Sequence, residues 1–163
     1  IIIGIDFGVV NPFAAICVAY NRKTKTIYVI DEYFKKNETT LYNGKIVKKK
    51  FEKWGKFKYV ICDPESKDGR MLLARHCGLP NKGAPKHIGI INTINLLKEK
   101  LAPDADGKPH LFIFNNCRQL LKEFRLYSWG KNKGKEAPQK NHDHGLDALR
   151  YIVAFLYRLN RHI

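Results

Sequence analysis

Apolar and polar positions in the first part of the chain fall into short apolar runs separated by polar turns, a pattern typical of β-strands. Residues 1–7 are apolar on both faces, which predicts a central strand covered from both sides. Residues 12–20 and 26–34 predict two more strands, and the polar turn 21–25 between them favours an antiparallel meander of the first three strands. A fourth, short strand is predicted at 59–62.

The rest of the chain alternates helical periodicity with short apolar runs. Apolar residues at helical spacing predict a helix over 88–101, and 110–114 predicts a fifth strand. Further helices are expected at 38–56, where Asn43-Gly44 interrupts the pattern, at 69–77, at 116–126 and from about 143 to 160. Segment 78–87 is expected to be a loop, and 128–142 a basic loop or exposed hairpin. The fold class predicted is α/β, with a mixed sheet of about five main strands and helices on both faces.

Three aspartates occupy chemically costly positions in this pattern. Asp6 and Asp63 each end a predicted apolar strand, and we expect these two strands to be adjacent in the centre of the sheet. Asp147 lies near the start of the last predicted helix. A carboxylate at the edge of an apolar core is costly unless it is paired, hydrogen-bonded or bound to a metal. Each acid also has an ordinary explanation: Asp6 and Asp63 fit strand-ending turns, and Asp147 fits the favourable electrostatics of a helix N-terminus.

Taken together, the three acids favour a metal-dependent phosphodiesterase. Sites in open α/β sheets form at the carboxyl ends of central strands, and on the last helix Asp143 and His144 lie on the same side as Asp147. Carboxylates suit Mg²⁺ or Mn²⁺. In a two-ion site, with ions about 3.5–4 Å apart, one activates water and the other stabilises the leaving oxygen. No lysine adjacent in sequence offers the acids a partner, so we expect them to repel one another.

Composition indicates one domain and a polyanionic substrate. The 163 residues are 44% hydrophobic, and thirty Lys and Arg against fifteen Asp and Glu give a formal charge of +15. Such charge suits nucleic acid; the basic residues form no amphipathic basic helix, and no apolar run approaches the ~20 residues of a membrane span, so no membrane partner is expected. The four cysteines form no CxxC pair and are expected to be buried and reduced.

The motifs resemble ribonuclease H-like nucleases, and most closely the nuclease domain of the large terminase subunits of tailed bacteriophages. The similarity rests on 3–8 with Asn11-Pro12, on 60–64, on the helix around Glu123, and above all on the closing segment 143–151, which resembles a DHxxDALRY pattern.

The resemblance implies a single nuclease domain over 1–163 that uses Mg²⁺ or Mn²⁺, two ions, to cut double-stranded concatemeric viral DNA during genome packaging. Asp6, Asp63 and Asp147 would be the metal ligands, and His144 and Asp143 would be accessory catalytic residues. The full-length protein would also carry an ATPase motor domain, for which no G-x-x-x-x-G-K-[ST] loop is present here. Its partners would be a small terminase subunit and the portal, in the cytoplasm of an infected bacterium. The isolated domain is expected to be a monomer.

The basic segment before the last helix is the candidate DNA contact. Lys131, Lys133, Lys135 and Lys140 lead into the acid-bearing helix, and contact to the phosphate backbone would be salt-sensitive and largely sequence-independent. A second basic group spans Lys48–Lys58.

Three other functions fit part of the pattern. An actin- or hexokinase-like ATPase shares the Asp-x-Gly element, but it needs a second related domain. Another ribonuclease H-like enzyme, such as a junction resolvase or integrase, fits the acids and is disfavoured by the closing segment. A non-catalytic DNA-binding module explains the charge and leaves the acids unexplained.

Overall fold

A mixed sheet of six strands forms the centre of the molecule. The computed structural model describes residues 1–161 apart from 9, 127–128, 133–134 and 139–142, and only the backbone of 129–132 and 135–138. The strand order is β5-β4-β1-β2-β3-β6. The strands are β1 (Ile2–Asp6), β2 (Phe13–Asn21), β3 (Thr26–Lys35), β4 (Tyr59–Cys62), β5 (Lys82–Gly83) and β6 (Leu111–Ile113). β1, β2 and β3 form the predicted antiparallel meander, whereas β4 runs parallel to β1, β5 to β4 and β6 to β3.

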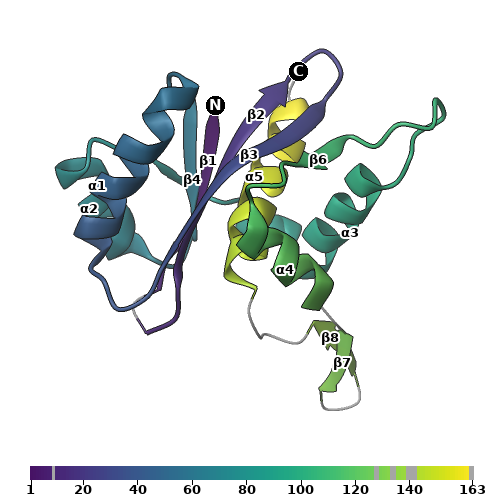
Figure 1. Ribbon diagram of the computed structural model, residues 1–163. Helices are drawn as coiled ribbons and strands as arrows, with labels where there is room; N and C mark the ends of the chain where they lie inside the picture. The colour runs from purple at the N-terminus through teal and green to yellow at the C-terminus, as the bar shows by residue number, and fades with distance from the viewer. Residues whose placement is uncertain (9, 127–128, 133–134, 139–142, 162–163) are drawn as a thin grey trace.

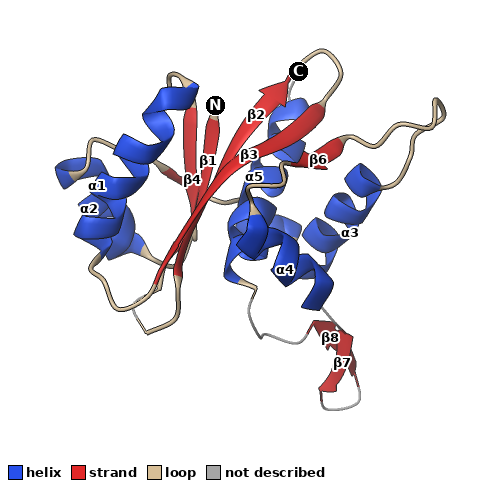
Figure 2. Ribbon diagram, in the orientation of Figure 1, coloured by secondary structure: helices blue, strands red, loops and turns tan. Residues whose placement is uncertain are grey.

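Helices cover both faces of this sheet, as predicted (Figures 1 and 2). They are α1 (Thr40–Phe51), α2 (Lys67–His76), α3 (Ile90–Leu101), α4 (Arg118–Leu126) and α5 (His144–Arg161), with short 3₁₀ turns at Glu52–Trp54 and Lys86–Ile88. The helices α1 and α2 pack on one face, around Val47, Phe51 and Leu73. The other face is covered by α3, α4 and α5, and α5 contributes most of the apolar contacts there. The apolar stripe of α5 is buried: Leu146, Leu149, Ile152, Val153 and Leu156.

One predicted segment differs in the structure. The sheet has six strands because β5 lies within 78–87, which was predicted to be a loop; two residues are too few to leave an alternating pattern. The helix predicted over 38–56 is confirmed as the shorter α1, which buries Asn43 and Gly44, the pair that interrupts its pattern. The Tyr33 hydroxyl donates to Asn43 Oδ1 at 2.8 Å, so tertiary contact stabilises a sequence with weak helical preference.

A two-stranded hairpin, β7 (Trp129–Asn132) and β8 (Lys135–Pro138), projects from the body beside α4 (Figure 1). The four cysteines are buried and unpaired, as predicted. Among the described helices, none is both long and apolar enough to cross a membrane.

Candidate active site

Asp6 is the last residue of β1 and lies beneath α5. Asp6 is only 7% exposed to solvent. The close approach of helix and strand depends on Gly4, because a Cβ there would overlap the Ala148 carbonyl and lie 2.9 Å from Ile152 Cγ1. With no side chain at this position, the first turns of α5 pack directly on β1. Residues 147 and 151 of the helix are thereby brought to the carboxyl end of the strand.

Asp63 follows β4 at the position next to Asp6. Ile5 and Cys62 are register partners in the parallel pair, and the backbone N–H of Asp63 donates to the Ile5 carbonyl at 3.0 Å. The prediction that both acids end adjacent central strands is therefore confirmed. Asp63 also makes the turn that its sequence predicts, because its carboxylate accepts the N–H of Glu65 at 2.9 Å and the hydroxyl of Ser66 at 3.1 Å. These contacts hold the carboxylate at the end of the strand.

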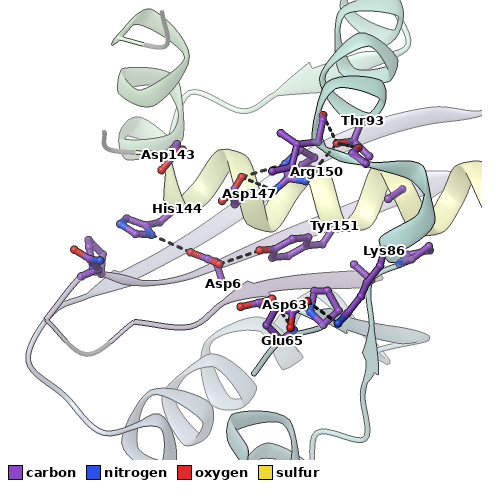
Figure 3. A pocket seen from close by; sticks show the side chains of 18 of the residues that line it. Asp6, Asp63, Glu65, Lys86, Thr93, Asp143, His144, Asp147, Arg150 and Tyr151 are labelled. Atoms are coloured by element: carbon purple, nitrogen blue, oxygen red, sulfur yellow. Dashed lines mark hydrogen bonds and ion pairs between the residues drawn. The ribbon is translucent and has the colours of Figure 1, made fainter. Parts of the chain in front are cut away.

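Asp147 lies one turn into α5 and is paired with Arg150. Arg150 donates through Nη2 at 2.8 Å and Nε at 3.1 Å to the same oxygen of Asp147, and through Nη1 to the Thr93 hydroxyl of α3 at 3.4 Å (Figure 3). No lysine lies next to the acids in the sequence, as expected, but Arg150 gives Asp147 a cationic partner. The partner lies one helical turn away along the same helix rather than next to it in the sequence.

Both oxygens of Asp6 are hydrogen-bonded by side chains of α5. His144 Nδ1 lies 2.9 Å from Oδ2, and the Tyr151 hydroxyl donates to Oδ1 at 3.2 Å (Figure 3). Burial raises the pKa of Asp6, the nearby Asp147 raises it further, and His144 counteracts part of the shift. The hydrogen bond to Asp6 in turn raises the pKa of His144. The imidazole of His144 therefore binds a proton more readily than a free histidine does, next to the Asp6 carboxylate.

The predicted acids and the histidine line one cleft. Asp6, Asp63, Asp143, His144 and Asp147 all border a cavity of ≈ 680 Å³ between β1, β4, α5 and the start of α3. Tyr151 is central to it: burial raises the pKa of its hydroxyl most, and the charges of Asp6, Asp147 and Asp63 each raise it further. All three carboxylates thus line the same cleft as Tyr151 and act electrostatically on its hydroxyl.

The acids are hydrogen-bonded to protein groups rather than arranged as a finished metal cage. Within the described part of the chain, no three His, Cys, Asp or Glu side chains are already disposed to hold an ion. Asp6 and Asp63 are bonded through both carboxylate oxygens, whereas both Arg150 bonds to Asp147 go to one oxygen, Oδ1.

Glu123 on α4 is a further residue of the site that the motif analysis did not assign a role. It is 2% exposed, and Oε2 accepts the backbone N–H of Leu146 at 3.0 Å, with Gly145 N–H also bonded to the carboxylate. A Cβ on Gly145 would lie 3.0 Å from Glu123 Oε2 and 2.5 Å from Phe34 Cζ, so glycine permits this close packing. Burial raises the pKa of Glu123 to about 7. Glu123 therefore caps the first turn of the helix that carries His144 and Asp147.

The predicted DNA-contacting lysines are only partly within the described structure. Lys131 lies on β7 and Lys135 on β8, where the backbone alone is described, while Lys133 and Lys140 fall outside the described residues. The second basic group lies on and after α1, on the opposite face of the sheet from α5. Two of its lysines pair with the buried Asp31, Lys50 at 2.9 Å and Lys53 at 3.2 Å. Part of that group therefore stabilises the fold.

Comparisons with known proteins give a consistent result. No family profile matches the chain. The large terminase subunit of Escherichia phage T5 is 26% identical over 163 residues, covering 96% of this chain. Among solved structures, the large terminase of the thermophilic bacteriophage D6E aligns with 96% of this chain at a TM-score of 0.78 and 23% identity. The large-terminase nuclease domain of bacteriophage SPP1, solved with bound Mn, aligns with 96% at a TM-score of 0.69 and 22% identity. The fold is that of the large-terminase nuclease domain.

The terminase nuclease fold accounts for most of one of these relatives and for a minor part of the others. The chain covers 85% of the SPP1 domain, but it spans 35% of the length of the T5 subunit and 39% of the D6E protein. The similarity therefore concerns the nuclease-domain part of the large terminases.

Proposed function

We propose that the chain is a divalent-metal-dependent DNA endonuclease, the nuclease domain of a large terminase subunit. Its substrate would be double-stranded concatemeric viral DNA, cut during genome packaging in the cytoplasm of an infected bacterium. The observation that carries this proposal is that Asp6, Asp63 and Asp147 line one cleft together with Tyr151. It occurs in a fold shared with terminase nuclease domains, one of which was solved with Mn. The formal charge of +15 suits a polyanionic substrate.

The donor set fits Mg²⁺ or Mn²⁺ in its chemistry. Asp6, Asp63 and Asp147 supply hard carboxylate oxygens, which these ions prefer. Three acids on two adjacent strand ends and one helix would support two ions, and Asp147 could contribute the oxygen that carries neither Arg150 bond. When bound, such ions would activate the attacking water and neutralise charge developing on the phosphate.

The side chains around Asp6 would set its position and protonation. Tyr151 keeps its proton because burial and, after it, the charges of the three carboxylates raise the pKa of its hydroxyl, so it acts as a permanent donor that orients Asp6. His144 would carry a proton on Nδ1, directed at the other oxygen of Asp6. It could exchange this proton with solvent, since its side chain is 20% exposed. Asp143 lies beside it at the cleft edge, where it would orient His144 or serve as a proton relay.

DNA would reach this cleft along the basic hairpin. Lys131, Lys133, Lys135 and Lys140 are the proposed backbone contacts, and the full-length subunit would add an ATPase domain, a small terminase subunit and the portal as partners. Replacing Lys131, Lys133 and Lys135 by Ala should weaken binding similarly for unrelated sequences. It should also flatten the log–log salt slope by roughly 0.9 for each phosphate that is no longer bound. An unchanged salt slope would mean that the DNA contacts lie elsewhere on the protein.

The direct test is cleavage of supercoiled plasmid with Mg²⁺, Mn²⁺ or chelator, comparing the unmodified chain with Asp6→Asn. This change keeps the shape of the side chain and removes one negative ligand, so it should abolish metal-dependent nicking while leaving the fold intact. Mn²⁺ should also raise the melting temperature of the unmodified chain, because an ion that binds only the folded state stabilises it. That rise should be smaller in Asp6→Asn.

Asp106→Asn is the matched control. Asp106 is an exposed loop residue and does not line the cleft. It should cut like the unmodified chain. His144→Ala should only reduce the rate, because water can replace part of a proton relay. Wild-type nicking by Asp6→Asn would refute the site assignment. Preferential cutting of four-way junctions over linear duplex would instead favour a resolvase.

A further inference from the structure

A second concave surface continues from the cleft along the same two helices. Residues at the start of α3 and Arg150 of α5 border the cleft. Along another side of α3 and the turn before it, and about two to three turns beyond Arg150 on α5, a groove of ≈ 680 Å³ opens between the helices. Its polar lining includes His87, Asn92 and Asn95 from the α3 side, and Arg158 and Arg161 from α5.

Most of the charged side chains that line this groove are positive, and in the part of the chain that the structure describes the two arginines are not neutralised by an acid. Both arginines are exposed, and within the described chain no acid or hydrogen-bond acceptor pairs with Arg158. Arg161 donates to the Tyr157 hydroxyl at 3.2 Å and lies over its ring at 5.5 Å from the centroid. This contact braces the guanidinium and leaves it unneutralised. Glu99 is the one acid among the residues that line the groove.

The spacing along α5 suits a duplex that continues out of the cleft. From Arg150 to Arg161 the helix rises about 16 Å, which is about half of a B-DNA turn of roughly 34 Å. Guanidinium groups bind phosphate through their forked donors, and the amide of Asn95 is a further donor of the kind that contacts DNA backbone. The amide of Asn92 already donates to the Ile88 carbonyl at 2.8 Å.

We propose that the groove between α3 and α5 binds the phosphate backbone of DNA flanking the cleavage site, with Arg158 and Arg161 as its two principal contacts. The proposal rests on the proposed function, since it extends the path of the same substrate. The contacts are to phosphate and therefore carry no base preference. The groove acts by holding the duplex and does not touch the reacting bond.

The test measures binding and cleavage separately. Fluorescence anisotropy with a labelled duplex, in chelator so that nothing is cut, gives affinity across a salt series. Arg158→Ala/Arg161→Ala should flatten the log–log salt slope by about 1.8, for two phosphate contacts at roughly 0.9 each. Between 50 and 200 mM salt, the unmodified chain should then lose about 12-fold more affinity than the variant.

Two further variants separate a local contact from general charge. Arg158→Lys/Arg161→Lys keeps both charges and should retain the slope. Lys45→Ala/Arg75→Ala removes two exposed charges from α1 and α2, on the other face of the sheet, and should leave the slope nearly unchanged. With Mn²⁺ and plasmid well below saturation, the groove variant should nick more slowly than the unmodified chain, whereas Lys45→Ala/Arg75→Ala should nick at the unmodified rate.

An unchanged slope in Arg158→Ala/Arg161→Ala overturns the proposal, and so does an equal loss in Lys45→Ala/Arg75→Ala. Failure of the unmodified chain to nick any DNA would count against the proposed nuclease, while the binding series would still report on the groove.

Discussion

Glu123 provides the sharpest test of how the site is held together. Its carboxylate lies in the core, 2% exposed, and accepts backbone N–H groups from the first turn of α5. Replacement by Gln keeps the size and one carbonyl acceptor but removes the ability to ionise. The variant therefore separates the cost of a buried charge from the benefit of its hydrogen bonds.

The magnitude follows from the pKa of Glu123. Burial raises it from the ordinary 4.5 to about 7, against the opposing effect of the backbone hydrogen bonds. Below pH 4.5 the carboxyl is protonated in both the folded and the unfolded chain. Between pH 4.5 and about 7 the folded state binds more protons, so its stability falls as pH rises. The shift of about 2.5 pH units corresponds to a loss of about 3 kcal/mol, complete above pH 7.

The assay is urea unfolding of both proteins from pH 4 to pH 8. The difference in unfolding free energy, Glu123→Gln minus the unmodified chain, should rise by about 3 kcal/mol across this window and then level off. Glu52→Gln, at an exposed position after α1, should show no such rise. A difference that stays constant with pH would refute the reasoning, because it would mean that Glu123 has the same pKa in the folded and unfolded states. In the same samples, NMR titration should give a lower pKa for His144 in Glu123→Gln, because the Glu123 charge contributes to raising it.

Two other substitutions probe the packing and charge of the site. Arg150→Leu removes the partner of Asp147. It should lower the free energy of unfolding, measured in urea without metal, by about 1–3 kcal/mol. Because Asp147 then lacks its ion pair, Mn²⁺ should raise the melting temperature of this variant more than that of the unmodified chain; an equal rise would mean that Arg150 does not compete with the ion. Gly4→Ala should lower the free energy of unfolding by about 1–3 kcal/mol, since the added methyl overlaps the backbone of α5. Calorimetry that finds Gly4→Ala as stable as the unmodified chain would contradict the close contact between helix and strand.

The sequence alone determined the strand and helix pattern and the positions of the principal acids. Apolar runs located β1 to β4 because strands buried on both faces leave a continuous signal, and the polar turn at 21–25 identified the meander. A strand that ends in an acid places that acid at the carboxyl edge of the sheet. For this reason the adjacency of Asp6 and Asp63 could be expected before the fold was known.

Only the tertiary structure decided which groups those acids contact. In sequence, Glu123 is an ordinary charged residue of an amphipathic helix, and its burial arises only because α4 packs against the first turn of α5. Likewise, Arg150 and Tyr151 were visible as part of a motif, but their hydrogen bonds to Asp147 and Asp6 depend on how closely α5 lies on β1. Periodicity records the environment along one element, whereas burial cost and pKa depend on groups that distant segments bring together, and these are fixed only when the elements pack.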